Sequence, residues 1–208
     1  MPLQNRVTPF GEIICTTARG TMMGNRGIIH EPRSKRLLTR RWQHQNWISC
    51  VLEFKGYQHP IMGVGSYTEL FFLDEATAFA AGHRPCAYCR RQDFDAFKRA
   101  WIEANAADRS VADVRAPNID RQIHRERVTR RREKVTFRAQ LGTLPDGTFI
   151  ADRGDAFLVS GRHLVVWRSE GYGAPVARLD DRWVTVLTPR SIVAAFRRGY
   201  RPHVHPTG

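Results

Sequence analysis

The feature that most limits how this chain can fold is a pair of cysteines three residues apart, Cys86 and Cys89, in the run Gly-His-Arg-Pro-Cys-Ala-Tyr-Cys-Arg. Two cysteines in such a tight turn can present both sulfurs to one ion, and thiolates are strong zinc ligands. A redox pair would need a thioredoxin-like setting, at the start of a helix that follows a strand. Here the pair follows a short helix pattern and a Pro-containing turn. The sequence therefore predicts half of a structural Zn2+ site.

The other zinc ligands must come from elsewhere in the chain. Cys50 lies in a predicted hairpin that precedes the cysteine turn, and we expect it to be the third ligand. The alternative is a buried core thiol, which is common for cysteine in an apolar strand. The fourth position is open between Cys15 and a histidine, either His30, which follows a Gly-rich turn, or His59. His83 lies within the turn itself, and we expect its ring to bond a backbone carbonyl instead.

A net charge of +13 is the second broad clue. Of the 33 Lys and Arg residues, only those at positions 35, 55, 98 and 134 are lysines. Arginine forks bind phosphate in a bidentate manner and stack on bases, so nucleic acid is the expected partner. A GC-rich genome would explain the preference for Arg over Lys, but not the excess of base over acid. Residues 33–41 hold five basic residues and no acid, and Trp42 and Trp47 flank their far end.

Nothing in the sequence indicates a membrane. No stretch approaches the roughly 20 continuous apolar residues of a membrane span. Residues 1–20 lack the basic start and apolar core of a signal peptide. We therefore expect a cytoplasmic protein with no membrane partner, in which cysteines stay reduced.

Local patterns predict mixed secondary structure in the first half. Strand patterns occur at residues 12–16, 47–54, 60–64 and 67–73. The second and third of these are expected to pair as a hairpin. Asp74 can cap a helix over residues 75–81, which Gly82 ends. A longer helix over residues 91–106 carries an aromatic stripe that we expect to face the core.

The second half begins with a linker at residues 107–117 and a basic helix expected over residues 118–134. This run is either a solvated helix face or a face that tracks phosphates. Further strands are predicted at residues 135–141, 148–151, 156–160, 163–167 and 183–187. Pro189 can open a final helix over residues 190–198.

These elements together predict an α+β fold. Residues 1–110 would form a small zinc-stabilised α/β region. Residues 111–208 would form a basic helix and a β-rich region, a small curved sheet or half-barrel with a C-terminal helix. The two regions could pack as one body.

The segment from Phe71 to Arg90 resembles the C-terminal half of the Ada-type zinc domain. That half has a strand ending in aromatics, a short Ala-rich helix and then Ala-Gly-x-Arg-Pro-Cys-x-x-Cys. The domain belongs to the bacterial sensor of methylphosphotriesters in DNA, and related modules accompany nucleases. The resemblance implies zinc on both cysteines of the turn and a DNA-facing surface around Arg84, Arg90 and Arg91.

The chain departs from that family upstream of the turn. Ada-type domains have two further cysteines close together there, whereas this chain offers His59, with Cys50 further back. The family's methyl-accepting thiolate has no direct counterpart, although a zinc-bound thiolate at Cys50 would remain nucleophilic. The whole chain also resembles a widespread set of bacterial proteins, a likeness that adds no function.

Three functions fit these patterns. The first is a zinc-stabilised DNA-binding protein, acting in DNA repair or in sensing a modification. Its expected phosphate contacts are Arg84, Arg90, Arg91, Arg121, Arg125, Arg130 and Arg131. The second is a metal-dependent nuclease or another nucleic-acid-processing enzyme, in which Asp120 and His124 share a helix face and Glu126 is a further candidate. The third is an interaction module whose β-rich half binds a protein; no common enzyme motif is present.

Overall fold

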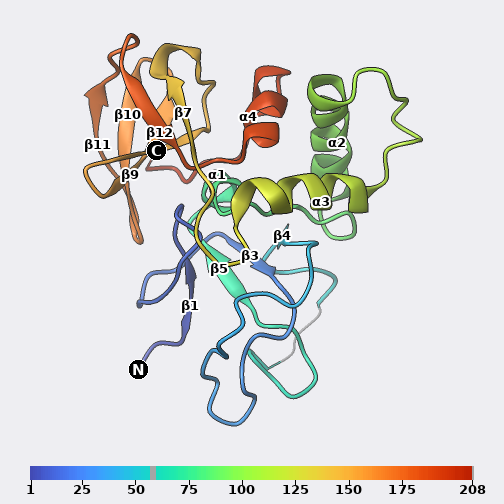
Figure 1. Ribbon diagram of the computed structural model, residues 1–208. Helices are drawn as coiled ribbons and strands as arrows, with labels where there is room; N and C mark the ends of the chain where they lie inside the picture. Colours follow the sequence, from blue (N-terminus) through green and yellow to red (C-terminus); the bar gives the residue numbers. More distant parts are fainter. Residues whose placement is uncertain (57–59, 208) are drawn as a thin grey trace.

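The computed structural model describes residues 1–56 and 60–207 and confirms the α+β class. Within those residues the chain forms two six-stranded sheets and four α-helices. Figure 1 shows the N-terminal sheet below, the C-terminal sheet above it on one side, and helices α2, α3 and α4 above it on the other. Among the described helices, none combines the length and apolar character needed to cross a bilayer.

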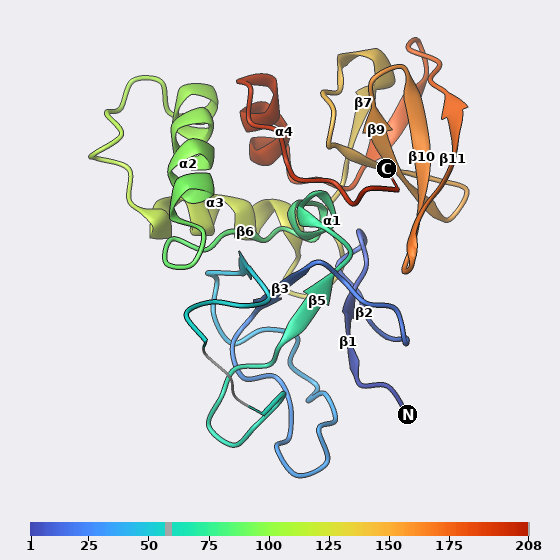
Figure 2. The same cartoon turned by 180° about the vertical axis from the view of Figure 1, so that it is seen from behind.

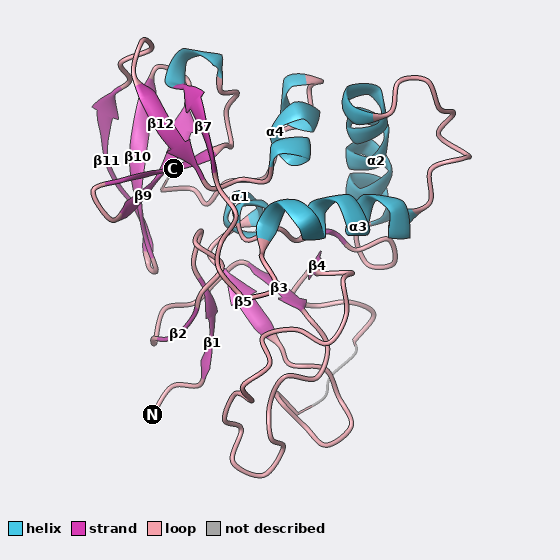
Figure 3. Ribbon diagram, in the orientation of Figure 1, coloured by secondary structure: helices cyan, strands magenta, loops and turns pink. Residues whose placement is uncertain are grey.

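The N-terminal sheet is mixed and built from very short strands. Its order is β2 (Ile13–Cys15), β1 (Gln4–Val7), β5 (Leu70–Phe72), β3 (Met22–Asn25), β4 (Ile48–Cys50) and β6 (Arg84–Pro85). The pairs β1–β5 and β4–β6 are parallel, and the other pairs are antiparallel. Long loops surround these strands (Figure 3), so the sheet depends on contacts between segments far apart in the chain.

The C-terminal sheet is antiparallel throughout. Its order is β11 (Gly171–Ala177), β10 (His163–Arg168), β9 (Asp155–Ser160), β8 (Phe149–Asp152), β12 (Trp183–Val186) and β7 (Phe137–Gln140). Strands β8 to β11 follow one another as a meander, because short turns connect antiparallel neighbours. All of its strands except β11 overlap predicted ranges closely.

Helix α1 (Glu75–Ala80) lies at the centre of the molecule, and every one of its residues is buried. Asp74 caps it by accepting hydrogen bonds from the Thr77 amide and hydroxyl at 2.8 and 2.7 Å, as predicted. Its Ala-rich sequence lets neighbouring elements approach closely on all sides. Figures 1 and 2 both place it where the two sheets and the helices meet.

Three buried clusters meet at α1 and join the two halves of the chain. Ala76 and Ala80 pack with the C-terminal sheet, and Ala78 packs with the N-terminal sheet. Phe79 packs with helices α2 (Arg91–Asn105), α3 (Ala116–Arg127) and α4 (Arg190–Arg197). The aromatic stripe of α2 is buried there as expected: Phe94, Phe97 and Trp101.

The C-terminal tail is tied to the first turn of α1. The amide of His203 donates to Glu75 Oε2 at 2.8 Å, and the amide of His205 donates to Asp74 Oδ2 at 3.0 Å. Tyr200 and Tyr172 donate their hydroxyls to the same two carboxylates. The second half of the chain therefore closes over the N-terminus of a helix from the first half.

The predicted hairpin between residues 47–54 and 60–64 is wrong. Strand β4 is only three residues long and pairs with β3 on one side and β6 on the other. The close approach of β3 is possible because Gly24 has no side chain; a Cβ there would lie 2.1 Å from the Ile48 carbonyl oxygen. The turn that was expected to join the hairpin falls partly on residues 57–59, outside the described part of the chain.

The basic helix is shorter than predicted and begins earlier. Pro117 lies in the first turn of α3, where its missing N–H loses no helical bond, and so the helix starts at Ala116. It ends at Arg127 because Val128 is extended and forms an isolated bridge with Lys134. The segment after α3 therefore turns toward the N-terminal sheet before it rises to β7 (Figure 1).

Candidate functional site

Three cysteines form a compact cluster at one end of β4. The ligand atoms of Cys50, Cys86 and Cys89 all lie within 4.8 Å of one another. The parallel pairing of β4 with β6 explains this, because Ile48 aligns with Arg84 and Ser49 with the next residue, which carries Cys50 alongside Cys86. The amide of Tyr88 donates to Cys86 Sγ at 3.4 Å, and this bond helps to hold the turn.

The donor set fits a tetrahedral metal ion. With Zn–S bonds of about 2.3 Å, two sulfurs on one zinc lie about 3.8 Å apart, within the span of this cluster. Contact with the other two thiols lowers the pKa of Cys86, and contact with Cys86 raises the pKa of Cys50. Because the three thiols contact one another, their titrations are coupled. They would release protons to the solvent on binding a metal ion.

The structure places the other predicted ligands away from this cluster. His30 is buried and its Nδ1 lies 2.7 Å from Thr68 Oγ1, so it does not join the three sulfurs. Cys15 is exposed and its thiol donates to the Pro2 carbonyl. His59 lies outside the described residues. The described part of the chain thus supplies three ligands.

Two of the arginines next to the cysteines are interior residues. Arg84 donates to both carboxylate oxygens of Asp120 at 2.7 and 2.8 Å. Arg90 donates to Glu75 Oε1 at 2.6 Å and to Ser49 Oγ at 3.1 Å. Because both guanidinium groups are buried and paired, phosphate contacts would have to come from other residues. Arg91 is exposed and pairs with Asp95 along α2.

The predicted pairing of Asp120 with His124 does not form. Both oxygens of Asp120 accept from Arg84, and Glu126 accepts from Gln122 and from the Ser191 amide and hydroxyl at the start of α4. The Nδ1 of His124 lies 2.8 Å from an Arg127 nitrogen. Burial and the Arg127 charge lower the pKa of His124 to about 4, which leaves the ring neutral and able to accept that bond.

A cavity of about 510 Å³ lies at the other end of β4, where Trp47 precedes the strand. Its lining combines aromatic and basic side chains. The basic residues are Arg26, Arg41, Arg127, Arg132 and Lys134, and the aromatic residues are Phe10, Trp42 and Trp47. Two exposed acids, Glu12 and Glu133, also line it.

Trp47 is in contact with two guanidinium groups. The Cζ of Arg26 lies 4.0 Å from the centre of the Trp47 ring system, and the Cζ of Arg127 lies 3.8 Å from it. Both arginines are 2% exposed and Trp47 is 3% exposed. Cation–π contact offsets part of the desolvation of these charges, but it supplies no negative charge.

The buried cations of this cavity have no carboxylate partner among residues 1–56 and 60–207. Arg26 donates to the Gly11 carbonyl and lies 3.4 Å from His83 Nε2. Arg127 donates to the carbonyls of Gly82 and Gln45, both at 2.6 Å. Its Nε is buried without a partner. The ring of His83 accepts from Arg26 through Nε2 and lies by the backbone of Ala78.

Burial, together with repulsion between the buried cations of the cavity, lowers their pKa values. Burial, followed by the charge of Arg41, lowers the pKa of Arg26 to about 9. Burial, followed by the charges of Arg26 and Arg127, lowers the pKa of Lys134 to about 7. The nearest acid to Arg127 is Asp120, which Arg84 already holds. A buried charge without a counter-ion is costly, so this arrangement favours an external anion.

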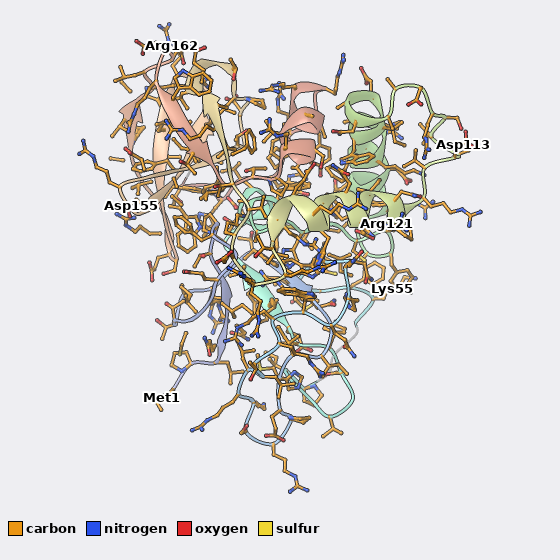
Figure 4. The ribbon with its side chains drawn as sticks, viewed as in Figure 1. Met1, Lys55, Asp113, Arg121, Asp155 and Arg162 are labelled. Atoms are coloured by element: carbon orange, nitrogen blue, oxygen red, sulfur yellow. The ribbon has the colours of Figure 1, made fainter. Side chains whose placement is uncertain are left out.

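Exposed arginines surround the same region. The exposed arginines of α3 and of the turn that follows it are Arg121, Arg125, Arg130 and Arg131, and Figure 4 labels Arg121 at α3. Arg132 donates to the Thr39 carbonyl, which places the turn beside the basic segment of residues 33–41. No ion pair with a described residue is formed by Arg121, Arg125, Arg130 or Arg131. We refer to the surface of residues 33–42 and 121–134 as the basic face.

The chain matches no protein-family model, no curated protein and no solved structure. In the sequence, Arg127 and Lys134 fall within the predicted basic helix, but no pattern indicates that either lines a cavity together with Arg26. Arg127 and Lys134 are close in the chain, whereas Arg26 is distant from both, and only the fold brings it to them.

Proposed function

We propose that the protein binds nucleic acid through the basic face, on a scaffold that a zinc ion stabilises at the three-cysteine cluster. The observation that carries this proposal is the group Arg26, Arg127 and Lys134, buried or half-buried cations with no carboxylate partner in the described chain, around a cavity at that face. Phosphate is the abundant anion that arginine forks bind best.

Several features agree with this proposal. The exposed arginines of α3 and the following turn would contact phosphates on both sides of the cavity. The resemblance to the Ada-type domain favours DNA, with a role in repair or in sensing a modification. Reduced thiols suit the cytoplasm, where three free cysteines remain available to a metal.

An enzymatic role for His124 has less support. Arg127 contacts its ring, and no carboxylate orients it. Asp120 and Glu126 both have their oxygens engaged within the protein. A nuclease activity therefore stays a prediction with no residue assigned to it.

Salt-dependent binding tests the proposal directly. Each arginine that neutralises a phosphate releases counter-ions, so affinity should fall steeply between about 50 and 200 mM salt. Substituting Arg125→Gln and Arg131→Gln together should reduce the slope of log K against log salt by about 2. The matched control is Arg153→Gln with Arg162→Gln, which removes the same charge from exposed turns of the C-terminal sheet.

The outcomes separate clearly. Retention of the full slope in the control, with loss in the first variant, supports the basic face as the binding surface. Absence of binding by the wild-type protein at the lowest salt, or equal losses in both variants, would refute it.

A further inference from the structure

We infer that the cavity beside Trp42 accepts one unpaired nucleotide, with its base against the aromatic lining and its phosphate on the surrounding cations. This inference rests on the proposed function and specifies its ligand. It depends on the residues that line the cavity and not on the total charge of the basic face.

The volume suits a single nucleotide. At about 510 Å³ the cavity is in the range of small-molecule sites, about 300–1,000 Å³. It is large for an inorganic phosphate and too small for a base pair with both its backbones. If the partner is nucleic acid, the part of it that fits this volume is one nucleotide of a strand.

The lining also matches a nucleotide chemically. Phe10, Ile13 and Trp42 offer apolar contact, and five basic side chains offer charge. A nucleoside would leave the cations without an anion, and a phosphate alone would leave the aromatic lining without a partner. A ligand that is both flat and anionic uses the two parts together.

Of the two tryptophans, Trp42 is the one available for stacking. Trp47 is only 3% exposed, and the guanidinium groups of Arg26 and Arg127 both lie against its ring. Trp42 is half-buried, tilted against Trp47, with its ring edge-on to His124 at a centroid distance of 5.6 Å. Part of its surface therefore remains open to the cavity, and base stacking on such a ring is sequence-tolerant.

Donors for the phosphate stand around the same space. Arg41 and Arg132 each donate one hydrogen bond to a backbone carbonyl, of Leu38 and Thr39 respectively. A guanidinium carries five N–H donors, so both keep free donors for a ligand. They lie at the exposed edge of the lining, whereas Arg26 and Arg127 lie inside it.

A base inside a perfect duplex cannot enter this cavity without leaving its stack. Extruding it costs a few kcal/mol, and least where the base is already unpaired. The protein should therefore prefer a bulged, gapped or single-stranded nucleotide over a matched duplex of the same length and charge.

The test compares two DNA duplexes that are identical except for one unpaired nucleotide in the middle of one strand. Binding is measured with wild-type protein, Trp42→Ala and the control Trp183→Ala, whose ring is 60% exposed on the C-terminal sheet. We expect the wild type and the control to bind the bulged duplex about tenfold more tightly or better, and Trp42→Ala to lose that preference. Circular dichroism confirms that each variant is folded.

A second measurement removes the polymer from the comparison. A nucleoside monophosphate should quench tryptophan fluorescence of the wild type, while the nucleoside and inorganic phosphate at equal concentration should not. Arg41→Gln provides an independent variant at the edge of the cavity and should weaken this quenching.

Equal binding of both duplexes by the wild type, with no quenching by the nucleotide, would overturn the inference and leave nucleic-acid binding by the basic face intact. Absence of binding to any nucleic acid would instead remove the proposed function itself.

Discussion

The two ends of β4 hold opposite chemistry. At one end, Cys50 joins two further thiols in a cluster that suits a cation. At the other end, Trp47 contacts two arginines that lack a carboxylate partner among the described residues and suit an anion. These ends are three residues apart in the sequence, about 10 Å along an extended strand.

Between these two ends, the buried arginines are paired with acidic side chains of the same chain. Arg84 on β6 is bound by Asp120, and Arg90 is bound by Glu75 and by Ser49 on β4. Each of these buried charges has its partner within the chain. The contrast teaches that burial of arginine does not by itself mark a site; the absence of a counter-ion does.

The largest effect should come from the cysteine end. Structural zinc contributes about 10–16 kcal/mol of binding free energy in zinc-finger peptides. We expect Cys86→Ser to lose bound zinc and to lower the free energy of unfolding by more than about 5 kcal/mol. Metal analysis and denaturant unfolding measure both, and Cys15→Ser is the matched control because its thiol is exposed and outside the cluster. A Cys86→Ser protein with wild-type zinc content and stability would contradict the metal site.

The next largest effect concerns the buried ion pair between Arg84 and Asp120. Arg84→Met leaves Asp120 buried without its partner, and breaking such a pair costs about 3–5 kcal/mol of unfolding free energy. Arg91→Gln removes an exposed pair on α2 and should change stability by less than about 1 kcal/mol. Denaturant unfolding of both variants measures the difference, and equal effects would mean that the buried pair is not structural.

The same substitution at the open end should behave differently. Arg127→Met leaves no carboxylate unpaired, only the carbonyls of Gly82 and Gln45, and we expect a loss of about 1–3 kcal/mol. Added pyrophosphate should raise the melting temperature of the wild type, because a ligand that binds only the folded state stabilises it. It should raise that of Arg127→Met much less. A larger loss of stability than in Arg84→Met would erase the distinction between paired and unpaired arginines.

The smallest effect is a pH dependence of binding. Lys134 faces Arg26 and Arg127, with Glu12 and Glu133 also lining the cavity, and its pKa is lowered to about 7. The amine is charged below that pH and neutral above it, so affinity for an anion should fall as pH rises. At pH 8 about a tenth of the amine is charged, so the affinity for a single-stranded oligonucleotide should fall up to about tenfold relative to pH 6.

Lys134→Met separates this effect from other titrations. The variant should bind more weakly at pH 6 and should show little change between pH 6 and pH 8. Since phosphodiesters keep their charge over this range, the comparison reports on the protein alone. An unchanged pH dependence in the variant would assign the effect to another group.

Local signals predicted the parts of the fold that depend on neighbours in sequence. Asp74 caps α1 and the aromatic stripe of α2 is buried, because caps and helical periodicity are properties of a few consecutive residues. Strand β11 was missed since Pro175 breaks its pattern; the sheet tolerates this proline because β11 is an edge strand. Strand β4 was assigned the wrong partner, because strand pairing is decided by segments far away.

The sequence by itself determined the α+β class, the helix before the cysteine turn, and the chemistry of three reduced thiols and many arginines. It predicted Cys50 as the third member of the cluster from a hairpin that does not form, so the residue was right and the reason was wrong. Only the tertiary structure decided which arginines are bound internally and which lack a partner. The physical reason is that a charge is satisfied by whatever lies within a few ångströms of it, and for Arg26, Arg84 and Arg127 those neighbours come from distant parts of the chain.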